Sequence, residues 1–125
     1  MTMLSRHKLL ELNDAWNPVI ECCGIILRDF TLVPLQNHSS TPELNFIMKW
    51  EDYEPYRDQI IATWHTHPHE SANLSVADYL MFKSNPEWRH FIVARDIIWA
   101  YSTRNSRVFL DKTYSIPRAP EGSLS

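Results

Sequence analysis

The sequence has little of what marks secreted, membrane-spanning or metal-clipped proteins. Among 125 residues there are two cysteines, Cys22 and Cys23, and adjacent cysteines are poorly placed to bridge each other or to form a Cys-x-x-Cys metal site. No apolar run reaches the roughly 18 residues of a transmembrane helix, and the start of the chain lacks the apolar core of a signal peptide. These absences predict a protein of the reducing cytoplasm that does not associate with membranes.

The sequence also lacks a basic run that could follow a phosphate backbone. Its 12 lysines and arginines are outnumbered by 15 aspartates and glutamates, which gives a net charge of −3. A weakly acidic chain without a basic stripe is disfavoured as a sequence-independent nucleic-acid binder. We therefore expect no nucleic-acid partner.

The length and composition are those of one soluble domain. A chain of 125 residues with 44% hydrophobic and 22% charged residues is close to the globular average, and it is too short for a (β/α)₈ barrel, which needs about 200 residues. We see no internal repeat. Prolines, a glycine and serines gather near the end of the chain, so we expect a domain over residues 1–114 and a flexible tail over residues 115–125.

The apolar pattern predicts a mixed α/β fold. One helix is expected after Ser5 and another from Ser75, both serines being good N-caps, and a short acidic helix is expected over residues 50–57. Strand-like runs lie at residues 25–27, 32–35, 44–48, 59–67, 90–94, 97–102 and 108–110. Helices alternating with strands indicate an α/β domain with one mixed β-sheet flanked by helices.

The central strand ends in a pair of histidines. On a strand, residues i and i+2 point to the same face, so His65 and His67 present both imidazoles to one point while Thr66 faces away. Pro68 follows at once, and because proline cannot donate to a sheet ladder the strand is expected to end there. Two neutral imidazoles at the open end of a strand are a good pair of zinc ligands.

The role of Asp78 has two interpretations. It could complete a set of two histidines and one aspartate, which leaves the fourth tetrahedral position for water, as in catalytic zinc sites. The stretch from Ser75 to Asp78 is also typical of a capping box, with the serine at the N-cap and the aspartate at N3. A lone His-x-His pair is common on protein surfaces, so the sequence leaves both interpretations open.

A longer pattern includes these residues. Glu21 precedes Cys-Gly and an apolar strand, and the spacing His65-x-His67-Pro-x₆-Ser75-x₂-Asp78 follows. This pattern closely resembles that of the JAMM (MPN+) zinc metallopeptidase family. Every position of the family motif is filled in this chain, and the resemblance covers roughly residues 5–110. It implies a single JAMM/MPN-like (cytidine-deaminase-like) domain.

The resemblance also implies a role for each motif residue. His65, His67 and Asp78 would bind one Zn²⁺ per chain. Glu21 would be the general base that returns the proton to the leaving amine, and Ser75 would help to stabilise the tetrahedral oxyanion. Gly24 is expected where a side chain would obstruct the close approach of two strands.

Within the family, the chain is similar to the phage and bacterial branch, which includes the amino-terminal domains of lambda-like tail assembly proteins. The similarity rests on Pro18, Met48 and the stretches at residues 36–37, 43–46 and 51–52. It implies hydrolysis of an amide bond in a protein substrate such as a tail protein, in the host cytoplasm or the virion tail. Two alternatives stay open, a structural tail or assembly protein that keeps its zinc, and a deconjugase of a ubiquitin-like modifier.

Four other histidines and one glutamate have simpler interpretations. His7, His38 and His90 are expected to be surface or hydrogen-bonded residues, because they have no partners in the sequence. His69 and Glu70 are expected in the loop beside the proposed zinc.

Overall fold

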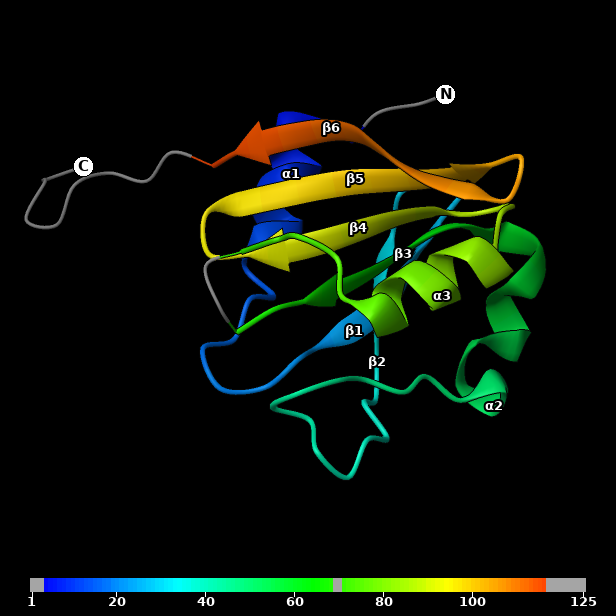
Figure 1. The fold of residues 1–125 in the computed structure, drawn as a ribbon, viewed down its shortest axis with the longest axis horizontal. Helices are drawn as coiled ribbons and strands as arrows, with labels where there is room; N and C mark the ends of the chain where they lie inside the picture. Colours follow the sequence, from blue (N-terminus) through cyan, green and yellow to red (C-terminus); the bar gives the residue numbers. More distant parts are fainter. Residues whose placement is uncertain (1–3, 69–70, 117–125) are drawn as a thin grey trace, which may run out of the picture.

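The computed structural model describes residues 4–68 and 71–116, and in this part of the chain six strands form one mixed sheet with helices beside it (Figure 1). The elements are α1 (Arg6–Asn13), β1 (Cys23–Leu27), β2 (Leu32–Leu35), α2 (Trp50–Tyr53), the 3₁₀ helix η1 (Glu54–Gln59), β3 (Ile60–Thr66), α3 (Val76–Ser84), β4 (Arg89–Ala94), β5 (Ile97–Arg104) and β6 (Arg107–Ser115). The α/β class with a mixed sheet is therefore confirmed.

The strand order is β2-β1-β3-β4-β5-β6. Only β3 and β4 run parallel among these neighbours, and the other pairs are antiparallel. A parallel pair needs a crossover connection, and α3 provides it between β3 and β4. This connection brings the first turn of α3 back toward the end of β3, where the histidine pair lies.

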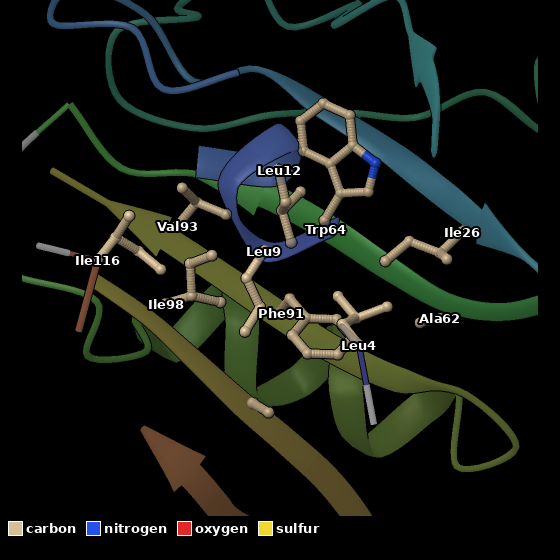
Figure 2. Close-up of a cluster of buried hydrophobic side chains, with 11 residues drawn as sticks. Leu4, Leu9, Leu12, Ile26, Ala62, Trp64, Phe91, Val93, Ile98 and Ile116 are labelled. Carbon is tan, nitrogen blue, oxygen red and sulfur yellow. The ribbon is translucent and has the colours of Figure 1, made fainter. Parts of the chain in front are cut away.

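The helices α1 and α3 cover opposite faces of the sheet (Figure 1). Leu9 and Leu12 of α1 pack in one buried cluster with Phe91 of β4 (Figure 2). The next residue, Ile92, belongs to a second cluster with Phe82 of α3. Because both faces of β4 are covered, it is a continuous apolar run rather than an alternating one.

The same alternation places the histidines of β3 on the α3 face. Ala62 and Trp64 belong to the cluster under α1, whereas the ring centroid of His65 lies 6.1 Å from that of Phe82 on α3. Thr66, the residue between the two histidines, accepts a hydrogen bond from the Cys22 amide through its hydroxyl at 2.8 Å.

Gly24 lies at a close approach of two strands, as its position before the apolar strand predicted. It pairs with Trp64 across the β1–β3 ladder. A Cβ atom at this position would lie 2.5 Å from Cε2 of the Trp64 ring and in contact with the Val33 carbonyl oxygen. The absence of a side chain therefore allows the indole to lie against β1.

The strand predicted at residues 44–48 is wrong. Leu44 lies in a turn, its amide donating to the Thr41 carbonyl at 2.9 Å, and residues 45–48 belong to no strand. The Asn37 side chain bonds to this segment instead, accepting from the Ile47 amide at 3.0 Å and donating to the Asn45 carbonyl at 3.1 Å. A side-chain amide that satisfies backbone groups in this way competes with sheet pairing.

The remaining elements match their predictions with shifted ends. The acidic helix predicted at residues 50–57 is divided into α2 and η1, with Pro55 in the first turn of η1. At the other end of the chain, Ser115 lies in β6 and Ile116 is only 6% exposed. These two residues therefore belong to the folded domain, whereas residues 117–125 of the predicted tail lie outside the described residues.

The thiols of Cys22 and Cys23 are both free, as their adjacency predicted. Burial is the main cause that raises the pKa of the Cys23 thiol to about 12, which suits a small core residue. None of the helices in the described part of the chain is long and apolar enough to cross a membrane.

Candidate metal centre

Two buried histidines converge where β3 ends. His65 is the penultimate residue of β3, and the chain keeps pairing with β4 just beyond the strand, since the His67 amide donates to the Val93 carbonyl at 2.8 Å. The side chains therefore point to the same face, and their Nε2 atoms lie 3.2 Å apart. His65 is fully buried and His67 is 7% exposed.

Asp78 reaches this pair from the first turn of α3. Its Oδ1 lies 3.0 Å from His65 Nε2, and its Oδ2 lies 3.1 Å from His67 Nε2. Burial opposes ionisation of this carboxyl, but hydrogen bonds with the two histidines hold its pKa well below its usual range. The structure thus brings together the three residues that the sequence interpretation grouped.

The capping box is present as well. Ser75 is the N-cap of α3, its Oγ accepts from the Asp78 amide at 3.1 Å, and its own amide donates to Asp78 Oδ2 at 3.0 Å. The two interpretations of Asp78 are therefore compatible, because the cap holds the carboxylate in the orientation that reaches the histidines. Ser75 itself lines the cavity above them.

The two ring nitrogens of His67 have different partners. Its Nδ1 lies 3.1 Å from the Ser71 carbonyl, which can only accept, so the neutral ring carries its proton on Nδ1. Burial opposes a charge on His67, but the hydrogen bond between its Nε2 and Asp78 Oδ2 raises its pKa. The charged ring donates from Nε2 to Asp78, whereas the neutral ring offers the Nε2 lone pair to a metal. Converging lone pairs of imidazole and carboxylate are the donor set that a zinc ion binds, and a second-shell carbonyl on the other ring nitrogen is typical of a metal-binding histidine.

An aromatic ring covers a further side of His65. The Phe46 ring stacks on it, with centroids 4.3 Å apart, whereas the sequence analysis used Phe46 only for the expected strand and the family likeness. The Nδ1 atom of His65 is buried without a hydrogen-bond partner among the described residues. Desolvation lowers the pKa of His65 despite the nearby Asp78, so burial favours the neutral ring that a metal requires.

Glu21 lies at the same point from the other side. One carboxylate oxygen of Glu21 and one ring nitrogen each of His65 and His67 lie within 4.8 Å of one another, and this buried group could hold a metal ion. The sequence interpretation treated Glu21 as a base and not as a ligand. The sequence spacing could not indicate that Glu21 is a ligand, because it lies more than forty residues away from the histidines along the chain.

The backbone around Glu21 fixes it beside β3. The Glu21 amide donates to the Pro42 carbonyl at 2.7 Å, and the Thr66 amide donates to the Cys22 carbonyl at 2.8 Å. Burial raises the pKa of Glu21 to about 7, with His67 lowering it and Asp78 raising it. A carboxyl with this pKa can both accept and release a proton near neutral pH.

A cavity of about 810 Å³ opens onto this cluster, with Glu21, His67, Ser75 and Asp78 in its lining. The segment that was wrongly predicted as a strand forms one wall, and Met81 and Trp88 also line it. The sequence interpretation assigned no role to Met81 or Trp88. The one feature of the sequence that could have pointed to them is their position, since Met81 lies on the helix that begins at the capping box and Trp88 lies just after it.

Of the other histidines in the described part of the chain, His7 is exposed, and His38 and His90 are hydrogen-bonded. His38 Nε2 lies 2.6 Å from Asp52 Oδ2. His90 is fully buried, with Nδ1 2.7 Å from Thr63 Oγ1 and Nε2 3.0 Å from the Asn85 carbonyl. His69 and Glu70, expected beside the centre, lie outside the described residues.

Comparison with protein-family models found no matching family, and comparison with the curated proteins found no matching sequence.

Proposed function

We propose that this chain is a zinc metallopeptidase of the JAMM (MPN+) type that hydrolyses an amide bond in a polypeptide or in an isopeptide-linked conjugate. The observation that carries the proposal is the convergence of His65, His67 and Asp78 at 3.0–3.2 Å, with Glu21 close by. A cavity lies beside this group, and Glu21, His67 and Asp78 line it. Two imidazoles and one carboxylate are a catalytic zinc set, which keeps one position open. A mixed sheet with helices on both faces supports the JAMM/MPN-like fold.

The residues of this chain divide the chemistry between them. A zinc ion held by His65, His67 and Asp78 would supply a Lewis acid and lower the pKa of water toward about 7. Glu21 accepts a proton from the attacking water and returns it to the leaving amine. The Ser75 oxygen already accepts from the Asp78 amide, so its hydrogen is available to donate to the developing oxyanion.

The sequence likeness supports a tail-associated protein of a phage or prophage, acting in the host cytoplasm or in the virion tail on a protein substrate.

One observation favours a structural role as the alternative. His65 and His67 come from the end of β3 and Asp78 from α3, so a metal there would join two elements and add its binding energy to folding.

Metal analysis of the purified full chain, with two variants, tests the proposal. We expect one zinc per chain in the wild type, loss of zinc in Asp78→Ala, and retention of zinc in Glu21→Gln. Hydrolysis of tail proteins or ubiquitin-like conjugates is expected to disappear in Glu21→Gln. A wild-type chain that takes up no zinc on reconstitution would refute the metal centre, and cleavage that persists in Glu21→Gln would refute the role of Glu21.

The structural alternative makes a different prediction for the same variants. In that case Glu21→Gln, with its zinc retained, assembles particles as well as the wild type does. Zinc removal then unfolds the chain, which circular dichroism detects.

A further inference from the structure

The cavity at the metal centre continues well beyond the residues of the proposed chemistry. Its volume is about 810 Å³, which is within the range of about 300–1,000 Å³ for pockets that bury a drug-sized ligand. Glu21, His67 and Asp78 line one part of it. The rest of the lining includes a set of large apolar and aromatic side chains, namely Ile25, Phe46, Met48, Tyr53, Met81 and Trp88.

The walls come from three stretches of the sequence, residues 21–25, 44–53 and 67–88. Met81 lies on α3 and Asn85 just after it, and Met48 belongs to the irregular segment before α2. Tyr53 and Trp88 contact each other edge to face, with centroids 6.1 Å apart. Methionine adapts to irregular apolar groups and contacts aromatic rings favourably, so these walls suit a large apolar group.

Further apolar side chains line the cavity while remaining open to solvent. Leu44 is 68% exposed, Ile47 53% and Val76 78%, and all three are lining residues. Large exposed apolar residues that gather around a cavity mark an interaction surface. The occupant of the cavity therefore has apolar groups of its own to bury.

We propose that the substrate is a polypeptide segment with a bulky apolar side chain, leucine or aromatic, next to the scissile amide, and that Met48, Met81 and Trp88 accept that side chain. The inference rests on the proposed function, because the same cavity contains the residues proposed to cleave the amide. A Gly-Gly segment would leave most of the cavity unfilled, and unfilled apolar walls forfeit the contacts that drive binding. The cavity thus favours processing of an ordinary polypeptide over removal of a Gly-Gly-terminated modifier.

Peptide binding tests this specificity separately from cleavage. The probes are acetyl-Ala-Phe-Ala-amide, acetyl-Ala-Leu-Ala-amide and acetyl-Ala-Gly-Ala-amide, titrated into the full zinc-reconstituted Glu21→Gln chain labelled with ¹³C at its methionine methyl groups. We expect the phenylalanine and leucine peptides to shift the signals of Met48 and Met81, and to bind about tenfold or more tightly than the glycine peptide.

Two tryptophan substitutions on α3 provide a matched pair. Met81→Trp, which fills the cavity, is expected to abolish the preference. Leu80→Trp, at the neighbouring residue that is 56% exposed and does not line the cavity, is expected to keep it. Equal affinity for the three peptides, no methyl shifts up to about 10 mM peptide, or a preference that survives Met81→Trp would each overturn the inference.

Hydrolysis by the wild-type chain separates this inference from the function on which it rests. Glu21-dependent cleavage without any side-chain preference removes the specificity pocket and leaves the peptidase. A binding preference for the apolar peptides with no cleavage of any substrate keeps the pocket and removes the peptidase.

Discussion

Ser75 and Asp78 cap each other at the start of α3, the serine oxygen accepting from the aspartate amide at 3.1 Å and the aspartate Oδ2 accepting from the serine amide at 3.0 Å. The same Oδ2 lies 3.1 Å from His67 Nε2. A helix cap that satisfies local backbone groups therefore also orients a carboxylate toward the histidine pair. In this protein the start of one helix and the geometry of the candidate metal centre depend on the same two side chains.

Substitution of Ser75 by alanine is expected to weaken both functions of the cap. Loss of an N-cap hydrogen bond costs about 1 kcal/mol of folding stability, and release of the Asp78 carboxylate lowers zinc affinity as well. Urea unfolding and a competition titration with a zinc chelator measure the two effects.

Ser5 offers a matched control, because it is the N-cap of α1 and accepts from the Lys8 amide at 3.2 Å. Ser5→Ala is expected to lose about as much stability and to leave zinc affinity unchanged. An equal fall in zinc affinity for both variants would contradict a specific role of Ser75 in orienting Asp78.

Glu21 and Asp78 are expected to differ as metal partners, although both lie close to the histidines. Asp78→Asn removes a carboxylate that contacts both imidazoles, so it should weaken zinc binding strongly. Glu21→Gln should weaken it less and reduce the rate of cleavage by about 10²–10⁴-fold, the range for general acid–base catalysis. If Glu21→Gln loses zinc as completely as Asp78→Asn, Glu21 is a ligand rather than a base.

His90 is expected to make the metal-free chain less stable in mild acid. Burial is the main cause that lowers the pKa of His90 from 6.5 to about 4 in the folded chain. Between these values the unfolded chain takes up a proton that the folded chain does not. Neutral, buried His90 therefore makes its full contribution to the free energy of unfolding above pH 6.5. This contribution falls as the pH drops toward 4, by about 3 kcal/mol at most.

The difference in unfolding free energy between the wild type and His90→Gln, measured in a chelator from pH 7 to pH 4, isolates this contribution. Groups that titrate in both chains, such as Glu21, cancel in the difference. We expect the wild type to lose its advantage as the pH falls, and a difference that stays constant would contradict the burial argument.

Gly24→Ala is expected to separate β1 from β3. The added Cβ would lie 2.5 Å from the Trp64 ring, and overpacking of this kind costs about 1–3 kcal/mol. Because Glu21 lies just before β1 and His65 lies on β3, cleavage should fall as well. Ile26→Val, on the same strand, should cost about 1 kcal/mol and leave the relative position of Glu21 and His65 unchanged, so an equal loss of activity in both variants would argue against this explanation.

The elements predicted from local pattern are largely those of the structure. Serine N-caps before amphipathic runs predicted α1 and α3, and the apolar run before Pro68 predicted β3, because capping and burial of a central strand depend on nearby residues. The strand at residues 44–48 was predicted wrongly because a local apolar pattern does not show whether a partner strand is present. A backbone ladder forms only where a neighbouring strand is available. Here the Asn37 side chain, and not a strand, bonds to the backbone of this segment.

The sequence by itself determined that His65 and His67 share one face, since the two-residue period of a strand requires it, and it offered a cap formed by Ser75 and Asp78 as one of two interpretations. Only the tertiary structure decided that these pairs meet, because their meeting depends on the crossover that returns α3 to the end of β3. It also decided the position of Glu21, which approaches the histidines through the antiparallel pairing of β1 with β3. The cavity beside them has walls from three separate stretches of the sequence, and local sequence patterns contain no information about how such stretches meet.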